Sequence, residues 1–194
     1  MNPKNSSTTL DIGCGSDPHG DVNVDLYPED RRQCVAAYDP RSIPNFVLAD
    51  ACSLPFADGA FDVVRASHVL EHIPSPLTAL KEWRRVCKSL GRVVVFVPSD
   101  FGSDDSDTHL YSWTPSTFRN LLQKVFPTVH SGYSNRFDAV KGNRLRWLKT
   151  PVWRVFKLLG FTSELYAVCC PSKTEIATEE VEKWRNDYLT RRIQ

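Results

Sequence analysis

Short apolar runs recur along the first hundred residues, and each one stops at a glycine, an aspartate or a polar loop. Runs of about four to eight hydrophobic or alternating residues between turn signals indicate β-strands. The strands predicted from this pattern span residues 9–12, 22–25, 46–49, 61–64 and 92–97. The last run is almost entirely β-branched, which favours a strand that is buried on both faces of a parallel sheet.

Helical periodicity appears between and after these strands. The clearest helix is predicted from Ser75-Pro76, an N-cap followed by a proline at the first helical position, to Gly91. A second helix is predicted to start at Thr114-Pro115. The apolar positions of the first helix are Leu77, Leu80, Val86, Cys87 and Leu90. Strands that alternate with helices predict an α/β three-layer sandwich.

The pattern changes after residue 126. Segments 128–133 and 165–170 are predicted to form a terminal antiparallel pair of strands. Ser172-Lys173-Thr174-Glu175 matches a capping box that opens a last helix. The apolar stripe of that helix comprises Ala177, Val181, Trp184 and Tyr188.

Length and charge bound the class of protein. A chain of 194 residues fits one domain, which we divide into a core (9–133), a basic insertion (134–163) and the last strand with the C-terminal helix (164–194). The net charge of +1 provides no general attraction to nucleic acid or to an anionic membrane. The polar N-terminus does not resemble a signal peptide, and no apolar run is long enough to span a bilayer. The six cysteines include no CxxC pair, so we expect reduced thiols, no metal site and a cytoplasmic protein.

Three successive strand ends carry groups that suit a nucleoside. Ligands of open α/β sheets bind beyond the carboxyl ends of the strands. Gly13 and Gly15 let the backbone turn sharply and leave space for a ligand to approach the main chain. Asp25 can accept hydrogen bonds from both ribose hydroxyls, and Asp50 can accept one from an adenine amino group. Each feature alone is equally well explained by a plain turn or a solvated carboxylate, but together they predict a nucleoside site.

The connection between the first two strands is too short for a full crossover helix. A parallel crossover normally needs about a dozen residues, and Asp17-Pro18-His19-Gly20 is typical of a tight turn. We therefore expect the first crossover helix to be absent or reduced to one turn. A nicotinamide dinucleotide is disfavoured because Pro18 breaks the G-x-G-x-x-G pattern, Asp25 comes too early, and no helix N-terminus awaits a pyrophosphate.

Four segments carry a family resemblance: Asp11-Ile12-Gly13-Cys14-Gly15, Asn23-Val24-Asp25, Asp50-Ala51-Cys52-Ser53-Leu54-Pro55-Phe56 and Ala66-Ser67-His68-Val69-Leu70-Glu71-His72. As a set they resemble the class I S-adenosylmethionine-dependent methyltransferases, in particular the type-11 methyltransferase group. The resemblance extends over residues 9–125. It implies a Rossmann-like, mostly parallel seven-stranded sheet with an antiparallel last strand. It also implies S-adenosyl-L-methionine as the cofactor and S-adenosyl-L-homocysteine as the product.

The resemblance implies roles for single residues as well. The two glycines of the first loop would face the methionine part of the cofactor, and Asp25 the ribose. Asp50 and Ala51 would face the adenine, while Ser67 and His68 would close over the cofactor. The expected cofactor-binding residues are Asp11, Gly13, Cys14, Gly15, Asp25, Leu26, Asp50, Ala51, Cys52, Ser67 and His68.

Two histidines are candidates for proton transfer. Methyl transfer from a sulfonium needs mainly positioning, but a hydroxyl acceptor also needs a base, for which histidine is suited near neutral pH. We predict His72 and His109 as catalytic candidates. His72 can equally anchor the start of the helix beside Pro74. His109, which lies in the loop after the fifth strand, can equally contact the acceptor or pack structurally.

The basic insertion bears on the choice of acceptor. Between residues 136 and 160, seven basic residues accompany a single acid, Asp138, and are interleaved with aromatic residues that include Trp147, Trp153 and Phe156. This composition predicts a lid or a docking surface for an anionic or lipid-linked acceptor, including contact with a membrane surface, although a solvated basic face explains it equally well.

Three functions follow from the sequence. We expect a methyltransferase that acts on a small-molecule, glycan or lipid-linked acceptor. The first alternative is a non-catalytic S-adenosylmethionine-binding protein of the same fold. A methyltransferase acting on RNA or another nucleic acid ranks last, because the basic segment is short and the chain carries no Asn-Pro-Pro-Tyr-type motif.

Overall fold

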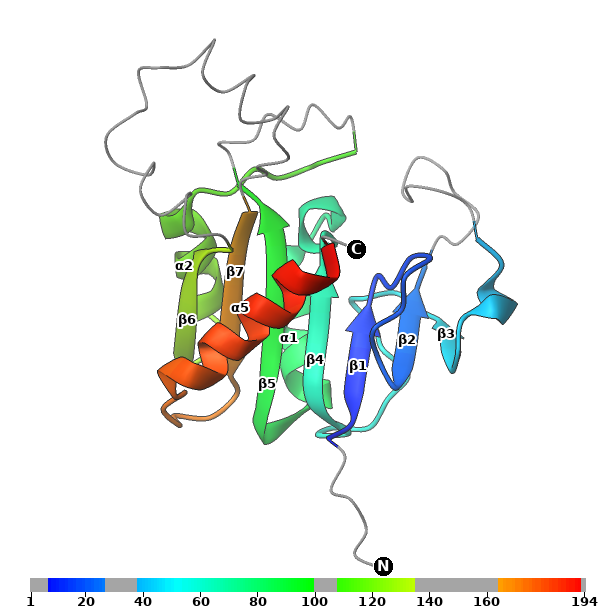
Figure 1. The fold of residues 1–194 in the computed structure, drawn as a ribbon, viewed down its shortest axis with the longest axis horizontal. Helices are drawn as coiled ribbons and strands as arrows, with labels where there is room; N and C mark the ends of the chain where they lie inside the picture. The colour runs from blue at the N-terminus through cyan, green and yellow to red at the C-terminus, as the bar shows by residue number, and fades with distance from the viewer. Residues whose placement is uncertain (1–6, 27–37, 100–107, 135–163, 193–194) are drawn as a thin grey trace, which may run out of the picture.

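The computed structural model describes residues 7–26, 38–99, 108–134 and 164–192, with a seven-stranded sheet at its centre (Figure 1). The strands lie in the order β3-β2-β1-β4-β5-β7-β6. Strands β1 to β5 pair in parallel, whereas β7 runs antiparallel to both β5 and β6. The predicted mostly parallel sheet with an antiparallel last strand is confirmed. The strands are β1 (Thr9–Ile12), β2 (Val22–Asp25), β3 (Phe46–Leu48), β4 (Phe61–Ser67), β5 (Cys87–Pro98), β6 (Thr128–Tyr133) and β7 (Glu164–Cys170).

Helices cover the sheet on both faces. Helices α1 (Pro76–Val86) and α2 (Pro115–Gln123) lie on one face, while α5 (Thr178–Arg192) crosses the other face over β4, β5 and β7 (Figure 1). Two short 3-10 helices, η1 (Pro40–Ser42) and η2 (Leu70–His72), complete the described helical segments. The three-layer sandwich predicted from alternating strands and helices is therefore confirmed.

The hydrophobic core is divided between the two faces because strand side chains alternate. The larger cluster joins the sheet to α1 and α2 and contains the fully buried Trp83 and Phe118. The smaller cluster lies under α5, where Val181 packs against Phe96 and its neighbours. At the start of α2, the side chains and backbones of Thr114 and Thr117 form a reciprocal capping box.

The connection between β1 and β2 contains turns and bends but no helix. Residues 13–21 close the crossover within a short loop, which confirms the expected loss of the first crossover helix. The Asp17 backbone N–H donates to the Cys14 carbonyl at 3.3 Å, and the Gly20 N–H donates to Asn23 Oδ1 at 2.9 Å. These local bonds satisfy backbone groups that a helix would otherwise pair.

Two helix boundaries differ from the prediction. Helix α1 ends at Val86 rather than at Gly91, and β5 begins at Cys87 instead of Arg92. Cys87 pairs with Phe61 and Arg92 with Val63, so β5 contains an irregularity where β4 advances only two residues. Leu90, which we placed on the buried helix face, is therefore 70% exposed. Helical spacing alone did not reveal that Cys87 pairs with β4 and belongs to β5.

The last helix starts later than the capping box suggested. Residues 171–177 form bends and coil, and α5 begins at Thr178. The Ser172 hydroxyl pairs with the Thr174 hydroxyl at 2.7 Å, so this polar segment forms a local turn instead of a helix cap. The stripe prediction is confirmed for Val181, which is buried, and for Trp184, which packs against the smaller core cluster.

Two further findings concern membrane-spanning helices and the cysteines. Within the described ranges, no helix combines the length and the apolar composition that crossing a membrane requires. The cysteines of these ranges, Cys14, Cys52, Cys87, Cys169 and Cys170, all carry free thiols.

Candidate functional site

The glycine loop after β1 has the backbone conformation that only glycine adopts readily. Gly13 (φ +67°) and Gly15 (φ +55°) both lie in the left-handed region. A Cβ on Gly13 would overlap the Val69 side chain, whereas a Cβ on Gly15 would meet no atom of the described residues within 4 Å. Gly13 therefore permits close packing of two strand-end loops, and Gly15 borders open space.

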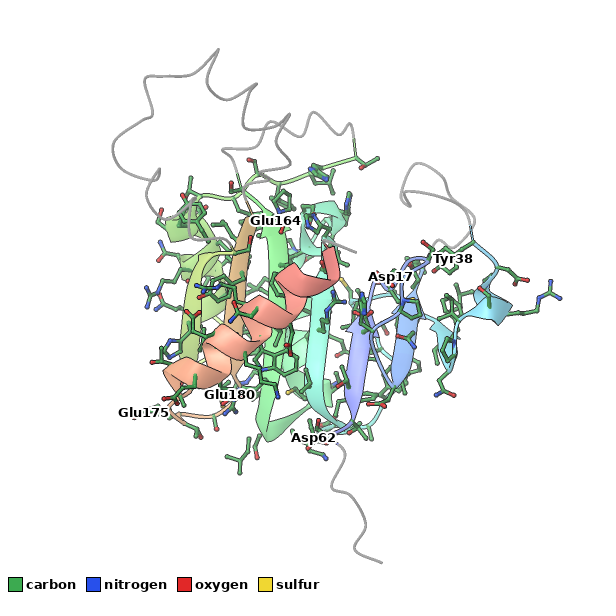
Figure 2. The ribbon with its side chains drawn as sticks, in the orientation of Figure 1. Asp17, Tyr38, Asp62, Glu164, Glu175 and Glu180 are labelled. Atoms are coloured by element: carbon green, nitrogen blue, oxygen red, sulfur yellow. The ribbon has the colours of Figure 1, made fainter. Side chains whose placement is uncertain are left out.

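Asp25, at the end of β2, closes the glycine loop. Its Oδ2 accepts a hydrogen bond from the Gly15 N–H at 3.0 Å, and its Oδ1 accepts one from the Leu26 N–H at 2.7 Å. Tyr38, which is labelled in Figure 2, lies beside Asp25 and Cys14, and burial together with the Asp25 charge raises the pKa of its hydroxyl. Burial and the charges of Asp25 and Asp11 raise the pKa of the Cys14 thiol to about 12. The Cys14 thiol is therefore uncharged at neutral pH and lines this loop.

Asp11, the penultimate residue of β1, is fully buried. Its Oδ1 pairs with the Arg65 guanidinium at 2.6 Å, and its Oδ2 accepts a hydrogen bond from the His19 N–H at 2.9 Å. Both oxygens are therefore engaged by the protein. The contacts give Asp11 a positioning role, since they hold the loop against β4.

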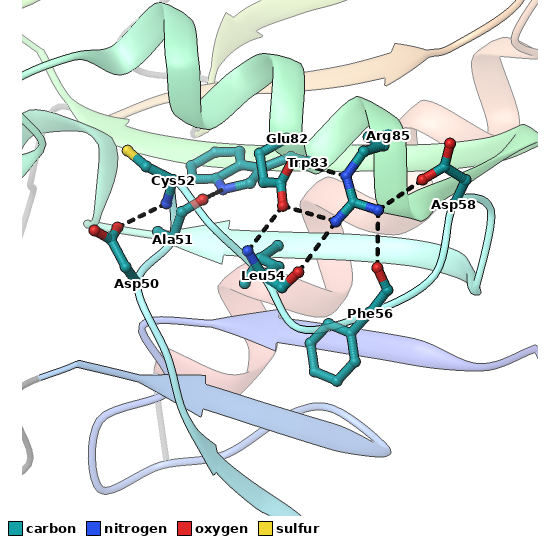
Figure 3. Close-up of polar contacts among 9 residues, drawn as sticks. All are labelled: Asp50, Ala51, Cys52, Leu54, Phe56, Asp58, Glu82, Trp83 and Arg85. Atoms are coloured by element: carbon teal, nitrogen blue, oxygen red, sulfur yellow. Dashed lines mark hydrogen bonds and ion pairs between the residues drawn. The ribbon is translucent and has the colours of Figure 1, made fainter.

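The loop after β3 carries the predicted adenine contacts. Asp50 Oδ1 accepts a hydrogen bond from the Cys52 N–H at 2.7 Å, and the Ala51 carbonyl accepts one from the Trp83 indole at 3.0 Å (Figure 3). Burial and Asp50 raise the pKa of the Cys52 thiol. Asp50 itself stays exposed, so its remaining acceptor capacity faces outward.

Helix α1 holds this loop through one guanidinium. Arg85 donates to the carbonyl oxygens of Phe56 and Leu54 and pairs with both Asp58 and Glu82 (Figure 3). Glu82 also accepts the Leu54 N–H at 2.8 Å. The hydrogen bonds from Arg85 lower the pKa of the Glu82 carboxyl, and Glu82 and Asp58 raise the pKa of Arg85. The network fixes the loop without a regular helix between β3 and β4.

His68 follows Ser67 at the end of β4 and takes a left-handed conformation (φ +55°). Its Nε2 lies 2.7 Å from Glu164 Oε1 of β7, and its Nδ1 lies 3.3 Å from Glu71 Oε1. Burial opposes the charged ring, but the contacts with Glu164 and Glu71 outweigh it and raise the pKa of His68 to about 9. His68 is therefore a cation held between two buried carboxylates.

His72 and His109 lie side by side at the same edge of the sheet. Their rings meet edge to face with centroids 4.8 Å apart. His72 Nδ1 is 3.1 Å from the Thr108 carbonyl oxygen, and the Leu110 N–H donates to the Glu71 carbonyl at 2.8 Å. The segment after β5 is thus bound to η2, and the two predicted catalytic residues are brought together.

The structure gathers the predicted site residues at the carboxyl ends of β1 to β5. The strand order reverses between β1 and β4, which is where open α/β sheets bind ligands. Sequence reasoning missed Tyr38, Arg65 and the buried Glu71. The signal available for Arg65 was a charged residue directly after the predicted strand 61–64. No pattern in the sequence points to Tyr38. Residues 135–163 of the basic insertion, which we predicted to form a lid or a docking surface, lie outside the described residues.

Comparison with known proteins supports the same class. Residues 10–95 match the family described as "Methyltransferase domain". A demethylmenaquinone methyltransferase of Paenarthrobacter aurescens is 35% identical over 145 residues, which cover 72% of this chain and 54% of the relative. A 2-methyl-6-phytyl-1,4-hydroquinone methyltransferase of Synechocystis is 29% identical over 148 residues, covering 69% and 45%. The chain thus spans about half the length of these curated relatives.

Solved structures share the fold. A methyltransferase bound to the Haloferax volcanii activator Trm112 superposes with a TM-score of 0.61 at 18% identity, covering 91% of this chain and 87% of that one. A Haemonchus contortus phosphoethanolamine N-methyltransferase in complex with S-adenosyl-L-methionine gives a TM-score of 0.54 at 16% identity, covering 88% of this chain and 50% of that one. The match over residues 10–95 and the shared fold make the chain similar to the class I S-adenosylmethionine-dependent methyltransferases.

Proposed function

We propose that the chain binds S-adenosyl-L-methionine at the carboxyl ends of β1, β2 and β3 and transfers its methyl group to a small-molecule acceptor. The observation that supports this most directly is the open space beside Gly15. That space adjoins Asp25, and the exposed Asp50 lies in the loop after β3, the neighbouring strand.

The chain's residues suit the parts of this cofactor. Backbone around Gly13 and Gly15 would hold the methionine part, Asp25 the ribose hydroxyls, and Asp50 with Ala51 the adenine. When bound, the cofactor supplies a methyl group already activated by its sulfonium. The protein's contribution is to orient donor and acceptor and to exclude water, which accounts for most of the rate in such reactions.

The exposed apolar surface after β5 supports a flat acceptor. Tyr111 is partly buried and stacks, with centroids 5.5 Å apart, on Trp113, which is buried in the core, and the Tyr111 hydroxyl donates to the Pro74 carbonyl at 2.7 Å. Leu110, beside them, is 56% exposed. Two of the relatives are named for methylation of quinones or hydroquinones. We therefore infer a hydroquinone-like acceptor, with the docking of an anionic or lipid-linked group by residues 136–160 kept as a prediction from the sequence.

Gly15→Leu tests the cofactor site. The new side chain fills the open space, so we expect calorimetry to show at least about tenfold weaker S-adenosylmethionine binding, equivalent to about 1.4 kcal/mol. Gly59→Leu is the matched control, because Gly59 has a similar φ of +63° and its added Cβ would meet only Lys88 Cα at 3.9 Å. Equal cofactor affinity in both variants would contradict the proposed site.

Turnover needs a second measurement. We expect transfer of a labelled methyl group from S-adenosylmethionine to short-chain hydroquinones, with S-adenosylhomocysteine formed in equal amount. Cofactor binding without transfer to hydroquinones, sugars or amines would instead favour the non-catalytic binding protein.

A further inference from the structure

Glu71, His72 and His109 form a cluster that the methyl-transfer site does not require. Their carboxylate and imidazole ligand atoms all lie within 4.8 Å of one another. Glu71 and His72 come from η2, whereas His109 comes from the segment that precedes α2. We propose that these three side chains bind a divalent transition-metal cation of the Zn²⁺ type. The proposal departs from the sequence-based expectation that the chain holds no metal.

The carboxylate of Glu71 is the first reason. Its side chain is fully buried, and within the described part of the chain its Oε2 has no hydrogen-bond partner. Its Oε1 lies 3.3 Å from Nδ1 of the His68 cation, whose Nε2 lies 2.7 Å from Glu164, so two buried carboxylates share one cation. A buried carboxylate oxygen without a hydrogen-bond partner is costly. A metal ion bound by Glu71 supplies that oxygen with a partner.

The orientation of His72 is the second reason. The Thr108 carbonyl can only accept, so the 3.1 Å contact places a hydrogen on Nδ1 and leaves the lone pair on Nε2. Metal-binding histidines are usually oriented in this way, with one ring nitrogen bonded to a backbone carbonyl or carboxylate and the other free to coordinate. The bond thus selects the tautomer that a metal requires.

The ligand set indicates the kind of ion. Two imidazoles and one carboxylate are the protein ligands of many catalytic zinc sites, with bonds of about 2.0–2.2 Å and an open fourth position. Ligands of one such ion lie about 3–4 Å apart, so the cluster needs to contract by only about 1 Å. Hard cations such as Mg²⁺ prefer all-oxygen ligands and fit this cluster less well.

The site also bears on the acceptor, a step that rests on the proposed function. The open position can hold an acceptor hydroxyl, whose proton then passes to water more readily. The oxygen forms its bond to the methyl carbon as the bond from that carbon to sulfur breaks, which leaves S-adenosylhomocysteine. Because His72 and His109 are neutral ligands in this arrangement, neither acts as the general base.

Titration of the EDTA-treated chain with Zn²⁺, followed by calorimetry, tests the site. We expect about one ion per chain, and at least about tenfold weaker binding in His72→Ala and in His109→Ala. His130→Ala is the matched control, because His130 is an exposed histidine on β6 and lies outside the cluster. Its Zn²⁺ affinity should equal that of the unmodified chain.

The Co²⁺-substituted chain gives a second readout. Imidazole and carboxylate ligands should produce visible absorption that disappears in both cluster variants. Absence of Zn²⁺ binding, unchanged affinity in both variants, or thiolate-to-cobalt absorption would overturn the proposal. S-adenosylmethionine titrations of the same samples keep the two claims apart, since a chain that binds the cofactor but no metal contradicts only the metal site.

Discussion

At the residue scale, the site depends on buried charges whose partners are far apart in the sequence. Asp11 and Arg65 lie on neighbouring strands, β1 and β4, directly opposite each other in register. The side chains of Asp11 and Arg65 are 1% and 15% exposed, respectively. The Arg65 guanidinium pairs with the Asp11 carboxylate and holds it next to the glycine loop. Removing one member of such a pair leaves the other charge buried without compensation.

Asp11→Ala should therefore destabilise the chain by about 3–5 kcal/mol in urea-induced unfolding. The exposed pair Asp39–Arg41 provides the control, since its side chains are 58% and 92% exposed, and Asp39→Ala should cost below about 1 kcal/mol. The double variant Asp11→Leu/Arg65→Met should recover part of the loss because no charge remains buried. A cost for Asp11→Ala no larger than for Asp39→Ala would contradict the pairing.

At the scale of elements, α1 stabilises the loop between β3 and β4, which contains no helix of its own. One turn of α1 presents Trp83 and Arg85 to the loop of residues 50–58, and their hydrogen bonds fix its backbone (Figure 3). The loop brings Asp50 to the edge of the sheet where we propose the cofactor site, although it contains no regular structure of its own. The element that positions the predicted adenine contact is therefore a distant helix.

Arg85→Ala should lower stability by about 1–3 kcal/mol, because the Leu54 and Phe56 carbonyls lose a charged donor. It should also weaken S-adenosylmethionine binding, since the loop of Asp50 loosens. Lys81→Ala, at an exposed position of the same helix, should leave both values unchanged. Thermal unfolding and calorimetry measure the two effects, and intact cofactor affinity in Arg85→Ala would show that the loop does not depend on this anchor.

At the scale of the whole molecule, one carboxylate joins three strands at the edge opposite the site. Asp62 of β4 accepts hydrogen bonds from the Thr8 N–H and hydroxyl and from Lys88 of β5 (Figure 2). The bonds from Lys88 and Thr8 lower the pKa of Asp62 to about 2. The ionised form therefore stabilises the folded sheet.

This stabilisation has a defined pH window. A carboxyl whose pKa is depressed on folding stabilises the protein above its unfolded pKa of about 4, and loses that contribution as the pH falls towards 2. Asp62→Asn should lower the midpoint of thermal unfolding at pH 6, with the difference from the unmodified chain shrinking at pH 3 and below. A difference that is constant over this range would show that the Asp62 charge does not contribute.

The sequence by itself determined the fold class and the bounds of three strands, whereas β4 extends to Ser67 instead of the predicted residue 64. Strand periodicity and turn residues are local signals, so β1, β2 and β6 appear with their predicted bounds and the short crossover after Gly15 is confirmed. The glycine pair, Asp25 and Asp50 could be found because each immediately follows a strand. Because these strands are parallel, their carboxyl ends lie at the same edge of the sheet, and the four residues lie there together.

Only the tertiary structure decided which distant groups meet. Pairing with Phe61 converts Cys87 from a predicted helical residue to a strand residue, because ladder hydrogen bonds outweigh a weak helical preference. The contacts of Arg65 with Asp11, of Arg85 with the adenine-side loop, and of His72 with His109 join segments whose separation in sequence carries no periodic signal. A buried charge is compensated by groups that can be distant in sequence. The contacts of Glu71 could therefore be identified only in the folded structure.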